Sequence, residues 1–179
     1  MPPPEAQQAE AAARHLLAEV QLGDMPPVDV DRVAAFLGIE VVREPLDDGV
    51  SGMLVRRDGA AVIAVNASHH VHRQRFTIAH EIGHFRLDDD ASALFVDGAF
   101  VYFREDGNTG HHDAREARAN AFAAALLMPE PAVRRVFAEG SFDVLNDQDM
   151  QRLARRFQVS TQALTLRAVR LKLTGVLPY

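Results

Sequence analysis

The amino-acid sequence predicts an α+β fold in which a small antiparallel sheet packs against helices. Three observations lead to this prediction. The chain has 179 residues, of which 47% are hydrophobic, enough for one globular domain with its own core. Apolar residues recur at helical spacing in both terminal parts, whereas short alternating segments lie between residues 39 and 66. Helices, then strands, then helices is an order typical of α+β domains.

The N-terminal part is expected to form two helices followed by three short strands. The helices are predicted at 5–21 and 29–37, and the strands at 39–43, 51–57 and 60–66. Glycine follows each helix, as is common at helix ends. Asp58-Gly59 lies between the last two strands and indicates a tight hairpin.

The remaining part is expected to be mainly helical. Helices are predicted at 71–87, 113–128, 131–139, 147–157 and 160–172, with one further strand at 99–105. Pro129 is expected to end the second long helix, because proline cannot continue the hydrogen-bond ladder. We expect residues 1–145 to form the main domain and 146–179 a helical subdomain packed on it.

Composition limits the classes of protein and of site. With 25 acidic and 19 basic residues the formal charge is -6, which argues against extensive binding of nucleic acid or anionic membranes. Cysteine is absent, so any metal must be held by His, Asp or Glu. Neither a signal peptide nor a membrane-spanning run of about 18 apolar residues is found, so a cytoplasmic location is expected.

The segment RFTIAHEIGHF, residues 75–85, contains the pattern HExxH. On a helix each residue turns by about 100°, so His80 and His84 share one face and can bind one ion. In this pattern the two imidazoles ligate zinc, and the glutamate, here Glu81, holds and deprotonates a water molecule. The competing interpretation is a solvated helix face whose histidines titrate freely.

A catalytic zinc site needs a third protein ligand, and two residues are candidates. Asp90 has the spacing of the last ligand in metzincins, but Leu87 stands where that pattern needs a glycine to turn the chain. Glu116 on a second helix would be the thermolysin-like solution, with Asn120 one turn further on the same face, placed to orient a ligand or to bind the substrate backbone. The alternative for Glu116 is a capping box with Asp113.

The two long helices together resemble those of a known family. RQRFTIAHEIGHF, followed some thirty residues later by EARANAFAAALLMP, is similar to the ImmA/IrrE family of metallopeptidases, and the likeness extends over roughly residues 28–173. The resemblance implies His80, His84 and Glu116 as metal ligands and Glu81 as the catalytic base. Family members often have a histidine at the position of Asp88, so this chain lacks whatever that histidine contributes.

The resemblance also implies a function. Family proteins are associated with the cleavage of helix-turn-helix transcriptional repressors, so the hypothesis is a zinc endopeptidase with one narrow protein substrate. Metal-activated water would attack the peptide carbonyl. Manganese is an alternative ion, since no coordination geometry can be read from a sequence.

Other residues are weaker candidates for a role near the metal. His112 and Tyr102 could stabilise a reaction oxyanion if their segments fold over the ion. The remaining histidines, His69, His70, His72 and His111, could form a second metal site, although solvated loops are the more usual place for such groups.

The C-terminal segment suggests an alternative function. LARRFQVSTQALTLRA resembles a helix-turn-helix, and residues 146–173 carry six basic and two acidic side chains. Arg155, Arg156 and Arg167 are therefore candidate contacts to DNA or to an acidic partner. On this alternative the chain is a DNA-binding or partner-binding regulator whose metal site is not catalytic.

Overall fold

The computed structural model describes residues 4–47, 49–57, 59–88, 94–97, 111–139 and 146–173, with the backbone alone at 94–97 and 111–113. Within these residues the chain forms seven helices and four strands. They are α1 (Pro4–Glu19), α2 (Val30–Phe36), β1 (Ile39–Glu44), β2 (Gly52–Arg57), β3 (Ala60–Asn66), α3 (Val71–Leu87), β4 (Leu94–Asp97), α4 (His111–Leu127), α5 (Glu130–Ala138), α6 (Asp147–Phe157) and α7 (Thr161–Arg170).

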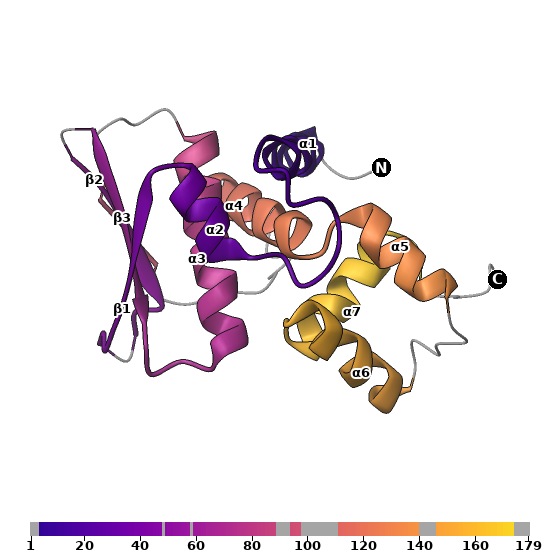
Figure 1. Ribbon diagram of the computed structural model, residues 1–179. Coiled ribbons are helices and arrows are strands. Elements are labelled where there is room, and N and C mark those ends of the chain that lie inside the picture. The colour runs from indigo at the N-terminus through magenta and orange to yellow at the C-terminus, as the bar shows by residue number, and fades with distance from the viewer. Residues whose placement is uncertain are drawn as a thin grey trace.

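The elements form three layers (Figure 1). The sheet lies on one side, α2 and α3 cover one of its faces, and α4 packs along α3 with α1 against it. Helices α5, α6 and α7 cluster at the opposite end of the molecule. The predicted α+β class is confirmed. No helix among the described residues combines the length and the apolar character needed to cross a membrane.

The sheet differs from the prediction because it is mixed. Its strand order is β1-β3-β2-β4, and β1 runs parallel to β3 while the other pairs are antiparallel. Strands β1 and β2 are consecutive in the chain but are not neighbours in the sheet. The β2–β3 hairpin places β3 between them. Asn66 holds the connection between β1 and β2, since its amide group donates to the carbonyls of Leu46 and Val50.

Where the two can be compared, the predicted elements agree closely with the observed ones, with one exception in the middle of the chain. The bounds of β3, α3 and α6 are those expected from the sequence. Strand β4 was not predicted. The strand expected at 99–105, which includes Tyr102, lies outside the described residues.

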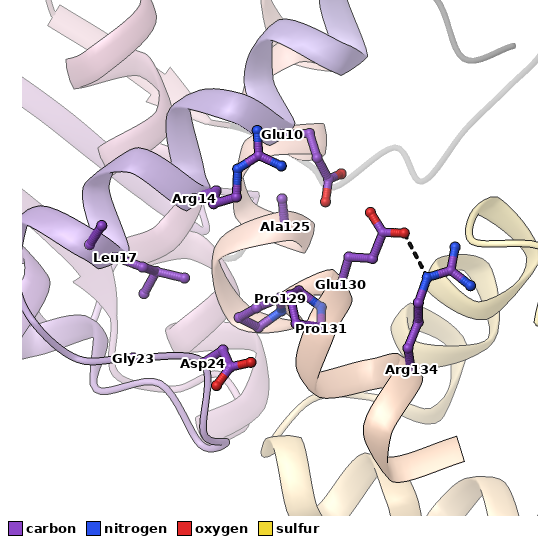
Figure 2. A pocket seen from close by; sticks show the side chains of 11 residues that line it. Glu10, Arg14, Leu17, Gly23, Asp24, Ala125, Pro129, Glu130, Pro131 and Arg134 are labelled. Carbon is purple, nitrogen blue, oxygen red and sulfur yellow. Dashed lines mark hydrogen bonds and ion pairs between the residues drawn. The ribbon is translucent and has the colours of Figure 1, made fainter. Parts of the chain in front are cut away.

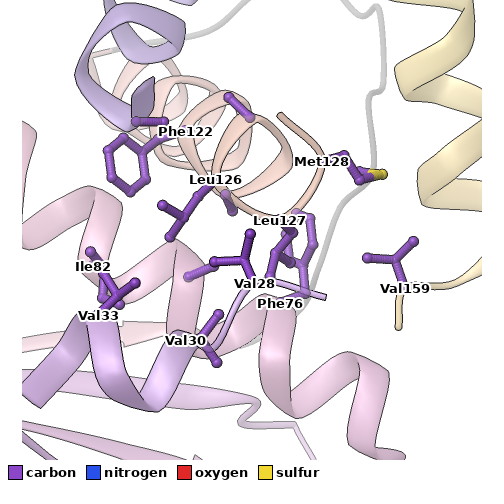
Figure 3. Close-up of a cluster of buried hydrophobic side chains, with 14 of the residues drawn as sticks. Val28, Val30, Val33, Phe76, Ile82, Phe122, Leu126, Leu127, Met128 and Val159 are labelled. Carbon is purple, nitrogen blue, oxygen red and sulfur yellow. The ribbon is translucent and has the colours of Figure 1, made fainter. Parts of the chain in front are cut away.

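One apolar cluster joins the main helices to the C-terminal end of the molecule (Figure 3). Phe122, Leu126 and Leu127 are fully buried, and the partly buried Phe137 packs against this cluster. Val159, from the turn between α6 and α7, is 2% exposed and lies in the same cluster as Phe76. Burial of each such side chain stabilises the folded protein by about 1.5–3 kcal/mol.

Polar contacts also attach the C-terminal helices to the rest of the molecule. The Arg75 side chain in α3 donates to the carbonyls of Val28 and Gln158, at 2.8 and 3.3 Å. Arg134 in α5 donates to the Leu171 carbonyl. The helical segment from 146 onward is thus docked on α3 and α5, and the division into domains at residue 145 stays a prediction.

Candidate metal centre

Helix α3 places both histidines and Glu81 in the interior of the protein. Ile78 and Ile82, on its apolar side, are fully buried. The histidine side is buried as well, because α4 covers it: His80 is 1% exposed, His84 2% and Glu81 0%. The sequence therefore does not form a solvated helix face at these histidines.

The close approach of the two helices depends on Gly83. A Cβ atom at this position would lie 3.2 Å from both the Cα and the carbonyl oxygen of Ala119 in α4. Such a distance is shorter than ordinary van der Waals contact, so a larger residue would push the helices apart. The glycine inside HEIGH thus brings α4 close enough for its side chains to reach the histidines.

Glu116 occupies the space between the two imidazole rings. Its carboxylate oxygens lie 3.2 Å from His80 Nε2 and 3.2 Å from His84 Nε2, and these two nitrogens are 3.0 Å apart. A residue that merely closed the start of α4 would direct its carboxylate to the backbone instead. Among the described residues, His80, His84 and Glu116 are the group of three that could hold a metal ion.

The outer nitrogen of each imidazole contacts an oxygen acceptor. His80 Nδ1 lies 3.0 Å from Asn120 Oδ1, and His84 Nδ1 lies 2.7 Å from Asp88 Oδ2. These oxygens accept hydrogen bonds, so each Nδ1 carries a proton and each Nε2 faces Glu116. A protonated Nε2 donates to the carboxylate, whereas a neutral imidazole offers the Nε2 lone pair to a cation. Asn120 therefore has the orienting position that was expected one turn after Glu116.

Asp88 is a residue whose role the sequence did not reveal. Asp88 ends α3 in a run of three aspartates, but its side chain is only 3% exposed. It accepts hydrogen bonds from Arg118 at 2.6 Å and from Arg115 at 3.1 Å, both in α4. A signal was available in the spacing, because the i,i+4 relation to His84 is that of an orienting carboxylate.

Charges in this cluster shift the pKa values of its members. Burial alone would raise the pKa of Glu116, but hydrogen bonds and charge from His80 and His84 outweigh it and hold the pKa far below its usual range. Burial lowers the pKa of His84, whereas Glu116 and Asp88 raise it, with a net increase. The pKa of Asp88 is lowered despite burial, because His84, Arg115 and Arg118 stabilise the carboxylate.

The donor set fits a divalent cation. Two imidazole lone pairs and one ionised carboxylate converge within a group whose ligand atoms all lie within 4.8 Å of one another. Ligands about 2.1 Å from a tetrahedral zinc ion would be separated by roughly 3.4 Å, near the 3.0–3.2 Å spacings found here. Nitrogen and carboxylate ligands suit zinc, and also manganese.

Several residues that were predicted to lie near the metal are either outside the described residues or away from His80, His84 and Glu116. Asp90 and Tyr102 lie outside the described residues, and His112 lies in the first turn of α4 without a described side chain. His70 precedes α3 and caps it by accepting from the His72 amide. Within the described part of the chain, no group of possible metal ligands is found at the histidines around the start of α3.

The three arginines predicted to contact DNA or an acidic partner differ in position. Arg155 is exposed on α6, and Arg156 pairs with Glu139 at 3.1 Å. Arg167 is 2% exposed; it donates to the Met128 carbonyl at 2.9 Å and to the Glu10 carboxylate at 2.7 Å. The prediction for Arg167 is wrong, because its guanidinium is buried between α7, α1 and the end of α4.

A hollow of about 580 Å³ lies on the face of α4 opposite Glu116 (Figure 2). Ala125 lines it and is nine positions from Glu116, which on a helix is half a rotation away. Its walls carry both signs of charge, including Glu10, Arg14 and Arg134. Neither His80 nor His84 is among the described residues that line this hollow.

The fold and the site together define a class of protein. Two imidazoles one turn apart on a buried helix, with a glutamate from a crossing helix, match the arrangement of an HExxH metal centre. Residues 34–169 match the peptidase M78 family, described as the IrrE N-terminal-like domain. The chain belongs to this family, as the resemblance of its two long helices predicted.

One known protein is similar to this chain in sequence, and another is similar to it in fold. The radiation response metalloprotease IrrE of Deinococcus radiodurans is 33% identical over 137 residues, which cover 73% of this chain and 38% of that protein. This chain therefore matches well under half the length of that relative. A transcriptional regulator of Mycobacterium tuberculosis has a similar fold, with a TM-score of 0.58 at 22% identity over 96% of this chain and 48% of the other.

Proposed function

We propose that the protein is a zinc-dependent endopeptidase, with manganese as the alternative ion. The observation that carries this proposal is the convergence of His80, His84 and Glu116 beside the fully buried Glu81. Membership of the M78 family and the likeness to a radiation response metalloprotease support it.

Each residue of the cluster has a distinct role in this reaction. His80, His84 and Glu116 would hold the ion. When bound, a divalent cation there would polarise a peptide carbonyl and make water acidic enough to act as a nucleophile near neutral pH. Glu81, turned by about 100° from the ligand face, accepts the proton of the attacking water and delivers it to the leaving amine nitrogen.

Asn120 and Asp88 act on the histidines rather than on the substrate. By accepting from Nδ1 of each ring they keep Nε2 available as a ligand and fix the plane of each imidazole. Arg115 and Arg118 keep Asp88 ionised and in place. Tyr102 and His112 stay predictions as oxyanion-stabilising groups.

The substrate we propose is one specific transcriptional repressor of the helix-turn-helix type. Burial of the cluster supports a narrow choice, because imidazoles that are 1–2% exposed can be reached by an extended segment and not by a folded surface. A protein with a flexible segment between its DNA-binding and dimerisation parts would present such a substrate. The resemblance to the ImmA/IrrE family points to the same class.

The test is direct cleavage. The zinc-loaded protein is mixed with candidate repressors, beginning with any that is encoded next to it, and the products are measured by mass spectrometry. We expect one cut with the wild-type protein and none with Glu81→Gln, since the variant lacks the general base. Equal cleavage by both proteins would refute the mechanism.

A DNA-binding regulator remains the second hypothesis. Helices α6 and α7 are joined by a turn at residues 158–160, with Gln158 in the left-handed region (φ 53°). However, Gln162 and Ala163 line a hollow that faces α3, and Arg167 is buried, so part of α7 is turned toward the molecule itself. Salt-dependent retention of the metal-free protein on duplex DNA would favour the regulator over the peptidase.

A further inference from the structure

A hollow of about 510 Å³ lies between the beginning of α3 and the beginning of α7. On the α3 side it is lined by His72, Arg73 and Phe76. On the other side it is lined by Val159, Ser160 and Gln162, from the α6–α7 turn and the first turn of α7. The C-terminal helices therefore form one wall of this hollow, which we name the α3–α7 hollow.

The α3–α7 hollow begins one helical turn from the metal centre along α3. Phe76 is one turn before His80 on the same side of the helix, and it also lines a narrower hollow together with Asn120 and Ala124. Asn120 contacts His80 directly, at 3.0 Å. The narrower hollow, of about 20 Å³, shares Phe76 and Ala163 with the α3–α7 hollow, so it adjoins both that hollow and the Asn120 side chain that contacts His80.

The wall formed by the C-terminal helices is held firmly in place. Val159 is 2% exposed and packs in the same apolar cluster as Phe76. Arg75, next to Phe76 in the sequence, donates to the Gln158 carbonyl at 3.3 Å. The hollow therefore keeps its shape without a partner, which lowers the entropic cost of binding a chain there.

The chemistry of the walls favours an acidic ligand. Arg73 is exposed at the rim, where its guanidinium donates to Ser51 Oγ at 2.7 Å. The pKa of His72 is lowered by burial and by the nearby His70 and Arg75, so its imidazole is largely neutral and Arg73 supplies the permanent charge. Among the residues that the structure describes, no aspartate or glutamate lines this hollow, although the whole chain is acidic. The hollow behind α4 differs, since Glu10, Asp24 and Glu130 line it.

The distance to the metal centre sets where such a ligand would lie along a substrate. Arg73 is seven positions before His80, a rise of about 10 Å along the helix. An extended peptide covers this distance in about three residues. A peptide with its scissile bond at the histidines would therefore bring a side chain near Arg73 about three residues away, on one side of the bond.

We propose that the α3–α7 hollow is a substrate subsite, which accepts an acidic side chain about three residues from the bond that is cleaved. This inference rests on the proposed peptidase function and adds a substrate preference to it. It also gives the helices α6 and α7 a role in substrate recognition. A peptide is favoured over a nucleic-acid phosphate as the ligand, because the hollow lies beside the metal centre rather than on an open basic surface.

The test measures binding separately from cleavage. Zinc-loaded Glu81→Gln protein is immobilised and incubated with a random dodecapeptide library, and the retained peptides are identified by mass spectrometry. We expect peptides with Glu or Asp to be recovered about three- to fivefold more than those with Gln or Asn, the size expected for a partly exposed ion pair. The wild-type protein should produce fragments with the acid about three residues from the cut.

Three further variants in the Glu81→Gln background assign the preference to this hollow. Arg73→Gln should abolish it, and Gln162→Glu should shift recovery toward peptides with Lys or Arg. Gln151→Glu, on the exposed side of α6, adds the same charge elsewhere and is the matched control, which should keep the preference. Thermal unfolding checks that each variant is folded.

The possible outcomes separate this proposal from the peptidase function. Cleavage without an acidic preference refutes the subsite and leaves the peptidase function intact. If acidic peptides are preferred in binding but the wild-type protein cleaves none of them, the subsite is supported and the peptidase function is refuted. The subsite is also refuted if acidic and neutral peptides are recovered equally or not at all, if Gln151→Glu acts like Gln162→Glu, or if a 20-base-pair duplex displaces the acidic peptides.

Discussion

Two buried polar clusters connect helices in this protein, and they differ in how their atoms are matched. The arginine cluster consists of Arg167, Glu10 and the Met128 carbonyl, where donors meet acceptors and opposite charges meet. The histidine cluster consists of His80, His84 and Glu116, where two imidazole lone pairs and a carboxylate face one point.

This difference indicates which cluster is structural and which binds a ligand. A buried ion pair loses hydration but is stabilised by its own hydrogen bonds, so the arginine cluster is complete as it stands. Groups that all offer electron pairs repel one another unless a proton or a cation lies among them. The buried histidine cluster therefore gains most from a cation, and the variants below should affect the two clusters differently.

The largest effect is expected from Glu81→Gln. The substitution keeps the size of the side chain but removes the proton acceptor, so the rate of cleavage should fall by about 10²- to 10⁴-fold. Zinc content, measured by atomic emission, should stay at the wild-type level because Glu81 is not a ligand. Loss of zinc together with activity would show that Glu81 holds the ion instead.

Glu116→Ala and Glu10→Ala should separate the two clusters. The first should weaken zinc binding by more than about 100-fold, because a ligand contributes more than its outer partners do. The second should leave zinc binding unchanged and lower the free energy of unfolding by about 3 kcal/mol, since it leaves the buried Arg167 without its carboxylate. Competition with a zinc indicator and urea denaturation measure the two quantities. Equal zinc affinity in Glu116→Ala and wild type would contradict the assignment of the third ligand.

Asp88→Asn should have an intermediate effect on the metal. The amide cannot offer the ionised acceptor that orients His84 and pairs with Arg115 and Arg118, so zinc affinity should fall by about 10- to 100-fold. The same zinc competition measures this effect, and the exposed pair Arg152–Asp149 supplies a control in Asp149→Asn. An Asp88→Asn protein with wild-type zinc affinity would show that Asp88 only ends the helix.

Gly83→Ala should act through the distance between α3 and α4. The new methyl group would meet the backbone of Ala119, which lowers the free energy of unfolding by about 1–3 kcal/mol. The better helix propensity of alanine partly offsets this loss. We expect zinc affinity to fall on the order of tenfold, as for a weakly disturbed ligand set. If zinc affinity and unfolding are both unchanged, the helices have room that the structure does not show.

The smallest effect is a pH dependence of zinc binding. Because the pKa of His84 is raised above 6.5 in the metal-free protein, protons compete with the ion around and above that pH. The pKa of Glu116 is lowered, so its carboxylate stays ionised and does not limit binding. Zinc affinity should therefore increase with pH, by up to about tenfold per unit below the pKa of His84. A constant affinity across this range would contradict the proposed competition.

The sequence predicted local features well because they depend on neighbours in the chain. The bounds of α3 follow from its apolar periodicity, and the histidine pair follows from its spacing. The parallel pairing of β1 with β3 could not be predicted, because it depends on where the β2–β3 hairpin lies in space. The Asp88 side chain looked solvated within an acidic run, but its burial depends on Arg115 and Arg118, about thirty residues away.

Anomalous X-ray scattering from a crystal grown with zinc, recorded above and below the zinc absorption edge, tests the central claim most directly. We expect one strong peak about 2.1 Å from His80 Nε2, His84 Nε2 and a carboxylate oxygen of Glu116. A crystal in which Glu116 points away from both rings, with no peak between them at a saturating zinc concentration, would contradict the account.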